Sequence, residues 1–564
     1  MFSENISKLI SEVLSKTCRN YFQESHNDIT FPEGLDIFVQ LTREQANGDL
    51  TTNVAMRLAS IVKRPPFEIA GIIADRLTED LKQETVGEFI SKIEPKGGFI
   101  NFWLSDKFFA SLLEAINNIK EKYGGSELGK GQHINLEFVS ANPTGPLTIA
   151  HGRQAAIGDA LSRILRFAGF KVTAEYYLND CGRQINLLGE SVKIRYKHLF
   201  GVKDEMPEDG YQGEYIGFIA EEIKEKVKDS KLDDTDENTA FFRKYAVDHI
   251  MKLINTDLAD FGVKFDIWTP QSDIEKKNEV EKVLDVLEKK EYIYESEGAK
   301  WFASSRLGDD KDRVVVKSDG SFTYLAPDIA YHLNKYERGF TKLVDLLGPD
   351  HHGYIRRMKA AAQALGHEKD SLEILIVQLV TLFRGGETVS MSTRKGEFVS
   401  LRELIDELGK DVTRFFFLSR RLDSHLDFDI ELAKRESAEN PVYYIQYAHA
   451  RICSIQKFGE EKQIDIKKAL KAIKLLETDA EKKLIRKLGE FPYVVVSCAE
   501  ALEPNKIILY LNELARLFHS FYTECRVVSD DAELTNVRLF LVNCVKIVLA
   551  NGLCLLNITM PEKM

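Results

Sequence analysis

The sequence predicts an α/β protein with three parts: a small N-terminal α+β domain, a doubly wound (Rossmann-type) domain, and an all-helical C-terminal bundle. From Ile134 a strand, a tight Gly/Pro turn, a helix and a second strand follow within about 45 residues, which is a βαβ unit. Only helical periodicity continues after about residue 405. A chain of 564 residues also exceeds what one hydrophobic core supports. The expected domains are 1–112, 130–405 with a helix-rich insertion at about 183–300, and 406–564.

The composition is that of an ordinary globular protein, with 44% hydrophobic and 29% charged residues. No stretch approaches the roughly 20 consecutive apolar residues that span a membrane. The first residues, MFSENISKLISEVLSK, lack the apolar centre of a signal peptide. We therefore expect a cytoplasmic protein with no membrane partner. We also expect it to be a monomer.

The cysteines and the net charge exclude little. Seven cysteines show neither a CxxC pair nor a Cys/His spacing, which argues against a disulfide framework or a structural zinc site. The net charge of −12 at first sight disfavours a nucleic-acid partner. A local basic surface is enough to bind phosphates, so that question stays open.

The N-terminal part, residues 1 to about 105, alternates helical patterns with turn signals. TNVAMRLASIV and FEIAGIIADRL carry apolar residues at helical spacing, and a short strand at 97–103 closes the unit. The Gly- and Lys-rich stretch 120–133 is predicted to be a linker.

The α/β part begins with the strand INLEFVS. An amphipathic helix, TIAHGRQAAIGDALSRILRFAG, ends at Gly169 and leads to the strand KVTAEYYL. After the charged insertion, DRVVVKS, KLVDLLG and LEILIVQLVTL are expected to complete the sheet.

The turn between the first strand and its helix is the first candidate site. Unpaired N–H groups and the positive end of the helix dipole suit an anion such as a triphosphate. His151 adds a donor and Arg153 a fixed charge; the alternative is a turn that only connects strand to helix. The predicted phosphate site comprises Ala141, Asn142, Pro143, Thr144, Gly145, Pro146, Leu147, Thr148, Ile149, Ala150 and His151.

A second candidate is the hydroxyl-rich loop TVSMSTRKGEFVSL, which follows an apolar strand. Ser392, Arg394 and Lys395 lie in it, and neighbouring glycines allow it to move. Two cations in a mobile loop are suited to clamp a leaving pyrophosphate. Taken alone, a solvated basic surface loop is the simpler interpretation.

Together, the two segments resemble the class I aminoacyl-tRNA synthetases, with a HIGH-type motif in a βαβ unit and a KMSKS-type loop about 240 residues later. The segments EFVSANPTGPLTIAHGR, EYYLNDCGRQINLLGESV, TYLAPDIAYHL, GPDHHGY, MSTRKGEFV and NPVYYIQYAHARI are similar to arginyl-tRNA synthetases. The resemblance covers nearly the whole chain. It implies that the protein forms arginyl-adenylate from L-arginine and ATP and then transfers the arginyl group to tRNA-Arg. Mg²⁺ would be bound to the nucleotide, with no dedicated metal site in the protein.

The resemblance also implies roles for single residues. Glu137 and Asn142 would hold the amino acid end of arginine, Tyr324 and Asp328 its guanidinium, and Asp350 would be a polar substrate contact. The catalytic residues would be His151, Thr148, Lys395, Arg394 and Ser392.

Each of these residues has an ordinary alternative role. Glu137 could pair with a lysine on a neighbouring strand, Tyr324 could be a core aromatic, and Asp328 could be a carboxylate that starts a helix. His351 and His352 suggest a metal site, but no third ligand is evident.

Both motifs depart from the family pattern. Thr148 and Ala150 replace the leading His and the Gly of the first motif, and the second motif lacks both lysines. Arg394 or Lys395 is expected to supply the missing charge.

For tRNA, the resemblance assigns the anticodon to the helical C-terminal part. Tyr443, Tyr444, Tyr447 and His449 offer rings for stacking on unpaired bases, and Arg451 offers a phosphate contact. Tyr443 and Tyr447 share one helix face, Tyr444 and Ala448 another, so one pair faces the core. Met564 is expected nearby. Asn101 and Phe102 in the N-terminal domain are candidates for a contact with the tRNA elbow, or residues of a simple core strand.

Three alternatives remain at this stage: a related nucleotidyl transferase, a different class I synthetase, and an inactive tRNA-binding paralogue. The long helical C-terminal part disfavours the first. The segments YLAPD and GPDHHGY favour arginine over other amino acids as the substrate. Thr148 and Ala150 keep the third open.

Overall fold

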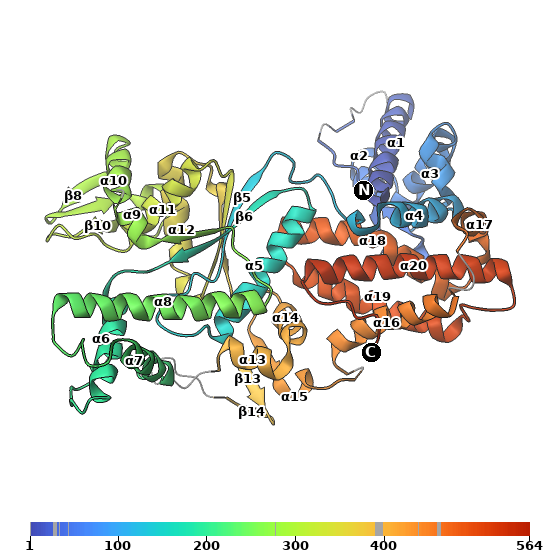
Figure 1. Ribbon diagram of the computed structural model, residues 1–564. Coiled ribbons are helices and arrows are strands. Elements are labelled where there is room, and N and C mark those ends of the chain that lie inside the picture. Colours follow the sequence, from blue (N-terminus) through green and yellow to red (C-terminus); the bar gives the residue numbers. More distant parts are fainter. Residues whose placement is uncertain are drawn as a thin grey trace.

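The computed structural model describes residues 2–25, 31–32, 34–42, 44–276, 278–389, 399–437, 439–459 and 464–564. Three units follow one another along the chain, and Figure 1 shows the N-terminal unit beside the C-terminal helices, with the parallel sheet on their other side. The predicted class, an α/β domain between a small α+β unit and a helical bundle, is confirmed.

The N-terminal unit packs helices on one antiparallel sheet of order β1-β2-β4-β3. The expected strand at its end forms as β4 and lies inside this sheet. Its elements are α1 (Phe2–Ser25), β1 (Gln40–Leu41), β2 (Leu50–Thr52), α2 (Val54–Val62), α3 (Pro66–Lys82), β3 (Ile90–Lys96), β4 (Phe99–Leu104) and α4 (Asp106–Ile119).

The central unit is built on a parallel sheet of order β12-β11-β5-β6-β7. Its strands and first helix are β5 (His133–Glu137), α5 (Ile149–Phe167), β6 (Lys171–Leu178), β7 (Ile267–Pro270), β11 (Lys342–Leu347) and β12 (Leu372–Ile376). The strand order reverses between β5 and β11. In doubly wound sheets, ligands bind outside the carboxyl ends of the strands at such a switch point.

The predicted insertion is wrong in one respect, because β7 lies within it and belongs to the main sheet. Another strand also changes place: DRVVVKS forms β10 (Arg313–Val316) in a separate antiparallel sheet with β8 (Ile293–Ser296) and β9 (Ala299–Phe302). The helices around these strands are α6 (Arg183–His198), α7 (Glu214–Val227), α8 (Asp236–Asp260), α9 (Gln271–Lys276), α10 (Glu279–Lys289), α11 (Leu325–Glu337) and α12 (Tyr354–Leu365).

The expectation of no strand after about residue 405 is also wrong. β13 (Val380–Arg384) pairs in parallel with β15 (Leu426–Asp429) and antiparallel with β14 (Glu387–Thr388). The parallel pairing requires a crossover, so the α/β architecture continues past the expected boundary. The crossover helices are α13 (Leu401–Leu408) and α14 (Lys410–Leu418), and the short α15 (Ile430–Ala433) follows.

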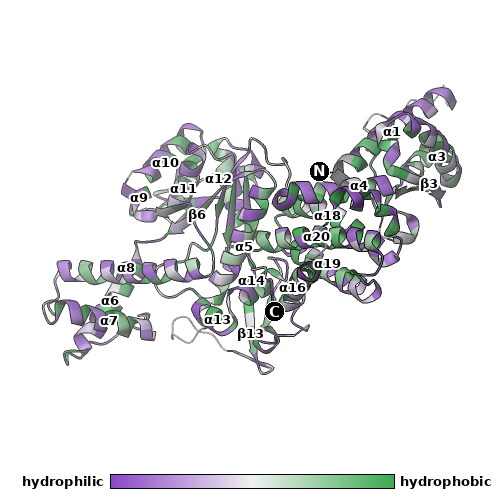
Figure 2. Cartoon of the chain, turned by 45° about the vertical axis from the view of Figure 1, so that its right-hand side comes forward, coloured by the Kyte–Doolittle hydropathy of each residue, from purple (hydrophilic) through white to green (hydrophobic). Residues whose placement is uncertain are grey.

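The rest of the described chain is helical, as predicted: α16 (Pro441–Gly459), α17 (Ile466–Lys471), α18 (Asp479–Ala501), α19 (Asn505–Glu524) and α20 (Ala532–Leu555). α18 and α19 carry hydrophobic and hydrophilic faces (Figure 2). Among the described residues, α20 alone has the length and apolarity of a membrane-crossing helix, but 72% of its most apolar window is buried inside the protein. It therefore serves as the core helix of the bundle.

Candidate functional site

The chain leaves β5 through a strained turn. Val139 and Ser140 have φ values of +69° and +37°, which residues with a Cβ rarely adopt. Ser140 Oγ holds this turn in place, because it donates to Glu137 Oε1 at 2.8 Å and accepts the Tyr177 N–H at 3.1 Å. Strained backbone that the surroundings fix in this way is typical of functional sites.

The helix after this turn begins with a side-chain cap. The backbone N–H of Thr148 donates to His151 Nδ1 at 3.2 Å. Because Nδ1 accepts this hydrogen bond, the ring proton lies on Nε2, which stays available as a donor. Burial lowers the pKa of His151 to about 4, so the imidazole is neutral at pH 7.

The intervening turn is held from the helices of the insertion. Asn142 Nδ2 donates to Gln184 Oε1 at 2.7 Å, and the Tyr215 hydroxyl donates to the Thr144 carbonyl at 2.7 Å. A Cβ on Gly145 would lie 3.1 Å from that hydroxyl, so the backbone approaches Tyr215 closely. The first motif therefore forms one rigid turn between β5 and α5.

The second motif lies largely outside the described residues, and with it Ser392, Arg394 and Lys395. Its last residues are described and return to the first motif. Ser400 forms an antiparallel bridge with Thr148, and the Leu401 N–H donates to the Leu147 carbonyl at 2.8 Å. The backbone thus ties the carboxyl end of the second motif directly to the start of α5.

Arg153 does not have the role expected from the sequence. Its side chain is fully buried, and its guanidinium donates to the carbonyls of Gln378, Arg421 and Ser424 at 2.8 to 2.9 Å. These hydrogen bonds join α5 to the segments that precede β13 and β15. The predicted charge for a phosphate at this position is therefore wrong.

Buried charges meet at the carboxyl ends of β5 and β11. Lys335 Nζ lies 2.5 Å from Glu137 Oε2 and 2.8 Å from Asp345 Oδ1. His332 Nε2 lies 2.8 Å from Asp345 Oδ2, and its Nδ1 lies 2.8 Å from the Asp328 carbonyl. Glu137 does pair with a lysine, but that lysine comes from α11 instead of a neighbouring strand.

The predicted guanidinium pair lies at the start of α11. Tyr324 is 87% exposed, which excludes a core aromatic, and Asp328 follows one helical turn later. The Tyr354 hydroxyl donates to Asp328 Oδ2. Burial raises the pKa of Asp328 to about 6, although the Tyr354 hydrogen bond lowers it. We refer to the α5 start together with Glu137, Tyr324, Asp328 and Asp345 as the switch-point site.

The loop after β11 is exposed. Asp350 lies in a short 3₁₀ turn with His351, whose Nε2 is 3.5 Å from Asp350 Oδ2. Within the described ranges no group of three or more His, Cys, Asp or Glu residues could hold a metal ion. The interpretation of His351 and His352 as a metal site therefore has no support from the described part of the chain.

Sequence reasoning missed Lys335, His332, Asp345 and Tyr354. A signal was present for two of them: His332 and Lys335 follow Asp328 at i+4 and i+7, on one helix face. Asp345 is a charge inside an apolar strand, which is a reason to expect a buried partner.

In the bundle, the exposed aromatic face is the one that carries Tyr447. Tyr447 is 42% exposed, whereas Ala448 is fully buried and the Tyr444 ring lies 4.6 Å from that of His519. The Arg451 guanidinium lies 4.5 Å from the centre of the Tyr447 ring. A pocket of about 920 Å³ is lined by Tyr447, Arg451, Tyr522, Arg526, Lys563 and Met564, among others.

Three other predicted tRNA contacts are buried. Asn101 is 3% exposed, and its Oδ1 accepts the Thr51 hydroxyl at 2.7 Å, while Phe102 is fully buried. β4 is an inner strand, and its central positions are buried on both faces, so Asn101 and Phe102 are core residues. His449 is 4% exposed and bonds the Pro561 carbonyl at 3.0 Å. All three side chains are buried, so none of them is available for contact with a tRNA.

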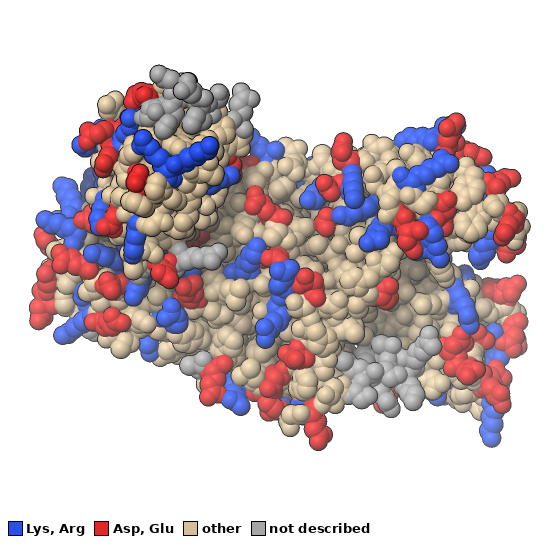
Figure 3. All heavy atoms as spheres, turned by 180° about the vertical axis from the view of Figure 1, so that it is seen from behind, with Lys and Arg blue, Asp and Glu red and all other residues tan. Residues whose placement is uncertain are grey.

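Figure 3 shows Lys and Arg interspersed with Asp and Glu over one face of the molecule. The net charge of −12 is therefore not gathered into a single acidic surface on this face. Local basic contacts with nucleic acid remain compatible with the acidic composition.

Comparison with known proteins matches all three units. Residues 4–104 match the arginyl tRNA synthetase N terminal domain, 113–416 the catalytic domain of tRNA synthetases class I (R), and 445–564 the DALR anticodon binding domain. The chain is 45% identical over 532 residues to an arginine–tRNA ligase of Geobacillus kaustophilus, covering 94% of both. It is 44% identical over 565 residues to that of Syntrophotalea carbinolica, covering all of both. An arginyl-tRNA synthetase structure from Thermus thermophilus has a TM-score of 0.74 at 22% identity over 99% of this chain and 100% of that one.

Proposed function

This chain belongs to the arginyl-tRNA synthetase family, and we propose that the switch-point site is where it activates arginine. The chain is an arginine–tRNA ligase, which converts L-arginine and ATP to arginyl-adenylate and transfers the arginyl group to the 3′ end of tRNA-Arg. One observation supports the location above others. Asp328 lies one helical turn after the exposed Tyr324 on α11; its Oδ2 accepts the Tyr354 hydroxyl, and it forms no ion pair within the described residues.

Asp328 and Tyr324 recognise the guanidinium of arginine. A carboxylate binds a planar guanidinium through two parallel N–H···O hydrogen bonds, and an exposed ring offers a face on which the guanidinium stacks. At the other end of the substrate, Glu137 and Asn142 receive the α-ammonium group. Asp350, exposed beyond β11, is a further polar contact.

ATP lies with its phosphates at the start of α5. A carboxylate oxygen of arginine attacks the α-phosphorus, and pyrophosphate leaves. The helix N–H groups and the Nε2–H of His151 donate to phosphate oxygens as negative charge develops. Mg²⁺ is carried by the nucleotide. Arg394, Lys395 and Ser392 hold the leaving pyrophosphate, since the second motif returns to Thr148 through Ser400.

Arginine-dependent ATP–pyrophosphate exchange, with and without tRNA-Arg, tests this proposal. Asp328→Asn should raise the KM for arginine about 100-fold, because truncating one side of a charge pair costs several kcal/mol. Asp285→Asn, at an exposed position on α10, is the matched control and should match the unchanged protein. Exchange with another amino acid, or none from the folded protein, would reject the assignment.

Lys395→Ala tests the clamp. Losing this cation should lower the rate of adenylate formation about tenfold or more, while tRNA affinity changes less. Equal losses in both would assign Lys395 to tRNA binding instead.

The pocket at Tyr447 is the proposed anticodon site. Unpaired bases stack on exposed rings, and Arg451, Arg526 and Lys563 supply positive charge next to them. Tyr447→Ala should raise the KM for tRNA about tenfold in aminoacylation. Tyr294→Ala on β8, where the ring is 39% exposed, is the control. An equal effect of both substitutions would contradict a specific contact at Tyr447.

We propose that the protein acts in the cytoplasm as a monomer. Its substrates are those of translation, and one chain supplies the activation site and the anticodon domain together. Light scattering of the purified full chain should give the mass of one chain at micromolar concentration. A stable dimer would contradict this proposal.

A further inference from the structure

Lys335 has no surface role, because its side chain is completely buried. It lies against β5 and β11, the two paired strands that meet at the switch point. Glu137 ends β5, and Asp345 pairs with it in register on β11. Lys335 Nζ contacts both carboxylates and lies 4.5 Å from the centre of the Tyr331 ring. A buried lysine is tolerated only where paired charges and hydrogen bonds offset its desolvation.

His332 completes the charge balance. Both of its ring nitrogens face oxygen acceptors, the Asp328 carbonyl and Asp345 Oδ2. Both nitrogens therefore donate, which requires the imidazolium form. Burial lowers the pKa of His332, but the Asp345 carboxylate outweighs it and the pKa is raised. Lys335 and His332 together balance Glu137 and Asp345. Asp328 is left with the Tyr354 hydroxyl and no ion-pair partner within the described ranges.

The orientation of Glu137 depends on the same contact. Ser140 Oγ holds Oε1 at 2.8 Å and Lys335 holds Oε2 at 2.5 Å. Each carboxylate oxygen has a second lone pair, so Glu137 can accept the ammonium group of a substrate without turning. Without Lys335, Glu137 and Asp345 would repel each other across adjacent strands.

We propose that Lys335 is a positioning residue for arginine, which fixes Glu137 to receive the α-ammonium group and leaves Asp328 as the anionic group for the guanidinium. This inference rests on the proposed function of the switch-point site. It concerns binding of the amino acid end, and it predicts little effect on ATP.

The test uses exchange kinetics of the full chain with tRNA-Arg. Lys335→Met keeps the length of the side chain and removes its charge. The KM for arginine should rise about 30-fold, the effect of losing a hydrogen bond to a charged group, with the KM for ATP within about twofold. Lys359→Met is the control, since Lys359 pairs with Glu373 at 3.1 Å at the amino end of β12. This control should leave both constants unchanged.

A double variant separates positioning from folding. Lys335→Met with Asp345→Asn removes one charge of each sign, so the cluster keeps its net charge. We expect it to fold and still to bind arginine weakly, because nothing then holds Glu137 Oε2. Competitive inhibition by 5-guanidinopentanoate, which is arginine without its α-ammonium group, should be unchanged.

Several outcomes would overturn the proposal. They are a double variant with the arginine KM of the unchanged protein, equal losses for arginine and for 5-guanidinopentanoate, or a double variant that does not fold. The last would show that Lys335 serves the fold itself. Failure of the proposed function looks different, since the unchanged protein would then show no arginine-dependent exchange.

Discussion

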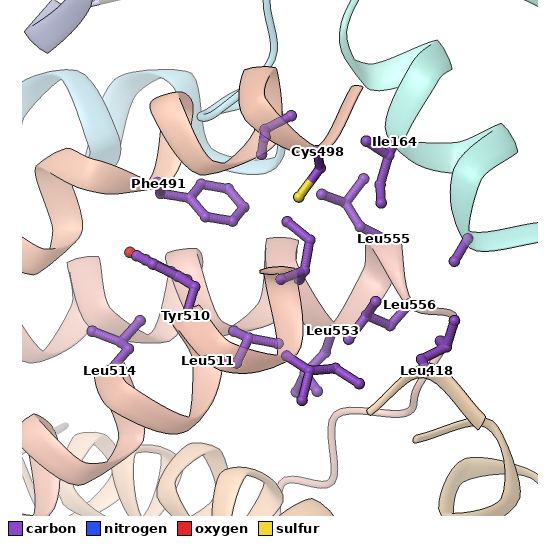
Figure 4. Close-up of a cluster of buried hydrophobic side chains, with 14 of the residues drawn as sticks. Ile164, Leu418, Phe491, Cys498, Tyr510, Leu511, Leu514, Leu553, Leu555 and Leu556 are labelled. Atoms are coloured by element: carbon purple, nitrogen blue, oxygen red, sulfur yellow. The ribbon is translucent and has the colours of Figure 1, made fainter. Parts of the chain in front are cut away.

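The carboxyl edge of the parallel sheet and the interior of the C-terminal bundle are both buried, but they differ in chemistry. In the bundle, apolar side chains from several helices meet around Cys498, and the ring of Phe491 lies near that of Tyr510 (Figure 4). At the carboxyl ends of the strands (called the sheet edge below), the buried side chains are instead the charged residues Glu137, Lys335 and Asp345.

The difference matters because the two kinds of contact respond differently to change. Apolar packing adds up from many weak contacts, so one substitution costs stability in proportion to the volume removed. Buried charges depend on specific partners, and removing one leaves another uncompensated. We therefore expect bundle substitutions to lower stability alone, and sheet-edge substitutions to change both stability and substrate binding.

The largest expected effect is at Glu175 on β6. Its side chain is fully buried and accepts hydrogen bonds from Asn135, Thr269, Tyr331 and Arg338. Glu175→Gln replaces one acceptor oxygen by an NH₂ group, which would face the four donors instead of accepting from them. It also leaves Arg338 without its counter-charge. The free energy of unfolding should fall by about 4 kcal/mol in denaturant titration.

Glu295→Gln, at an exposed position of β8, is the control for this measurement and should change stability by less than about 0.5 kcal/mol. If Glu175→Gln were equally neutral, the sheet edge would not depend on its charges, and the contrast with the bundle would fail.

Leu511 tests the other region. It is fully buried on α19 and packs so closely on α20 that a Cβ added to Gly552 would lie 2.6 Å from Leu511 Cδ2. Leu511→Ala should lower the free energy of unfolding by about 3 kcal/mol through the cavity it leaves. At temperatures where the variant is folded, the arginine KM should not change. A raised arginine KM would show that the two regions are coupled.

The same contrast explains what the sequence could predict of the fold. The apolar periodicity of α18, α19 and α20 is local, so the bundle was predictable from a single chain. α5 was predictable for the same reason. Its end was predictable from Gly169, which has a φ of +91° just after the helix. β10 was assigned to the wrong sheet, and β7 was missed inside the predicted insertion. Pairing partners in a sheet are set by distant segments and not by the strand's own pattern.

The candidate site shows the same limit. Its motif residues stand in contiguous turns and could be identified from the sequence. Lys335 and Glu137 are 198 positions apart, so their contact could not be read from any local pattern. Arg153 was misassigned because a cation at a helix start suits a phosphate and a cluster of carbonyls equally well. Asn101 was misassigned because alternation does not show that both faces of an inner strand are covered.

The next largest effect is expected in the pH dependence of activity, where kcat/KM for arginine falls on the acid side (the acid limb). Arginine binds the ionised form of Asp328, whose pKa is raised to about 6. The kcat/KM for arginine should be constant near pH 7 and above, and should fall about tenfold per pH unit below 6. Rates of exchange from pH 5 to 8 at subsaturating arginine measure it.

The sign of the linkage separates this loss from unfolding. Because burial raises the pKa of Asp328 from 3.8, the folded state binds a proton between pH 4 and 6 that the unfolded chain does not. Protonation of Asp328 therefore favours the folded state as the pH falls through this range. An acid limb that followed the unfolding transition would contradict its assignment to Asp328.

The smallest effect is expected at Tyr354. Substituting it tests whether a hydrogen bond from a neutral hydroxyl supports the ionised form of Asp328. The Tyr354 hydroxyl donates to Asp328 and lowers its pKa against the effect of burial. Tyr354→Phe removes about 1 kcal/mol of interaction, so the KM for arginine should rise about fivefold. The acid limb should also move to higher pH, because the carboxylate loses a donor that stabilises its ionised form. A purely structural role of Tyr354 would change stability without moving that limb.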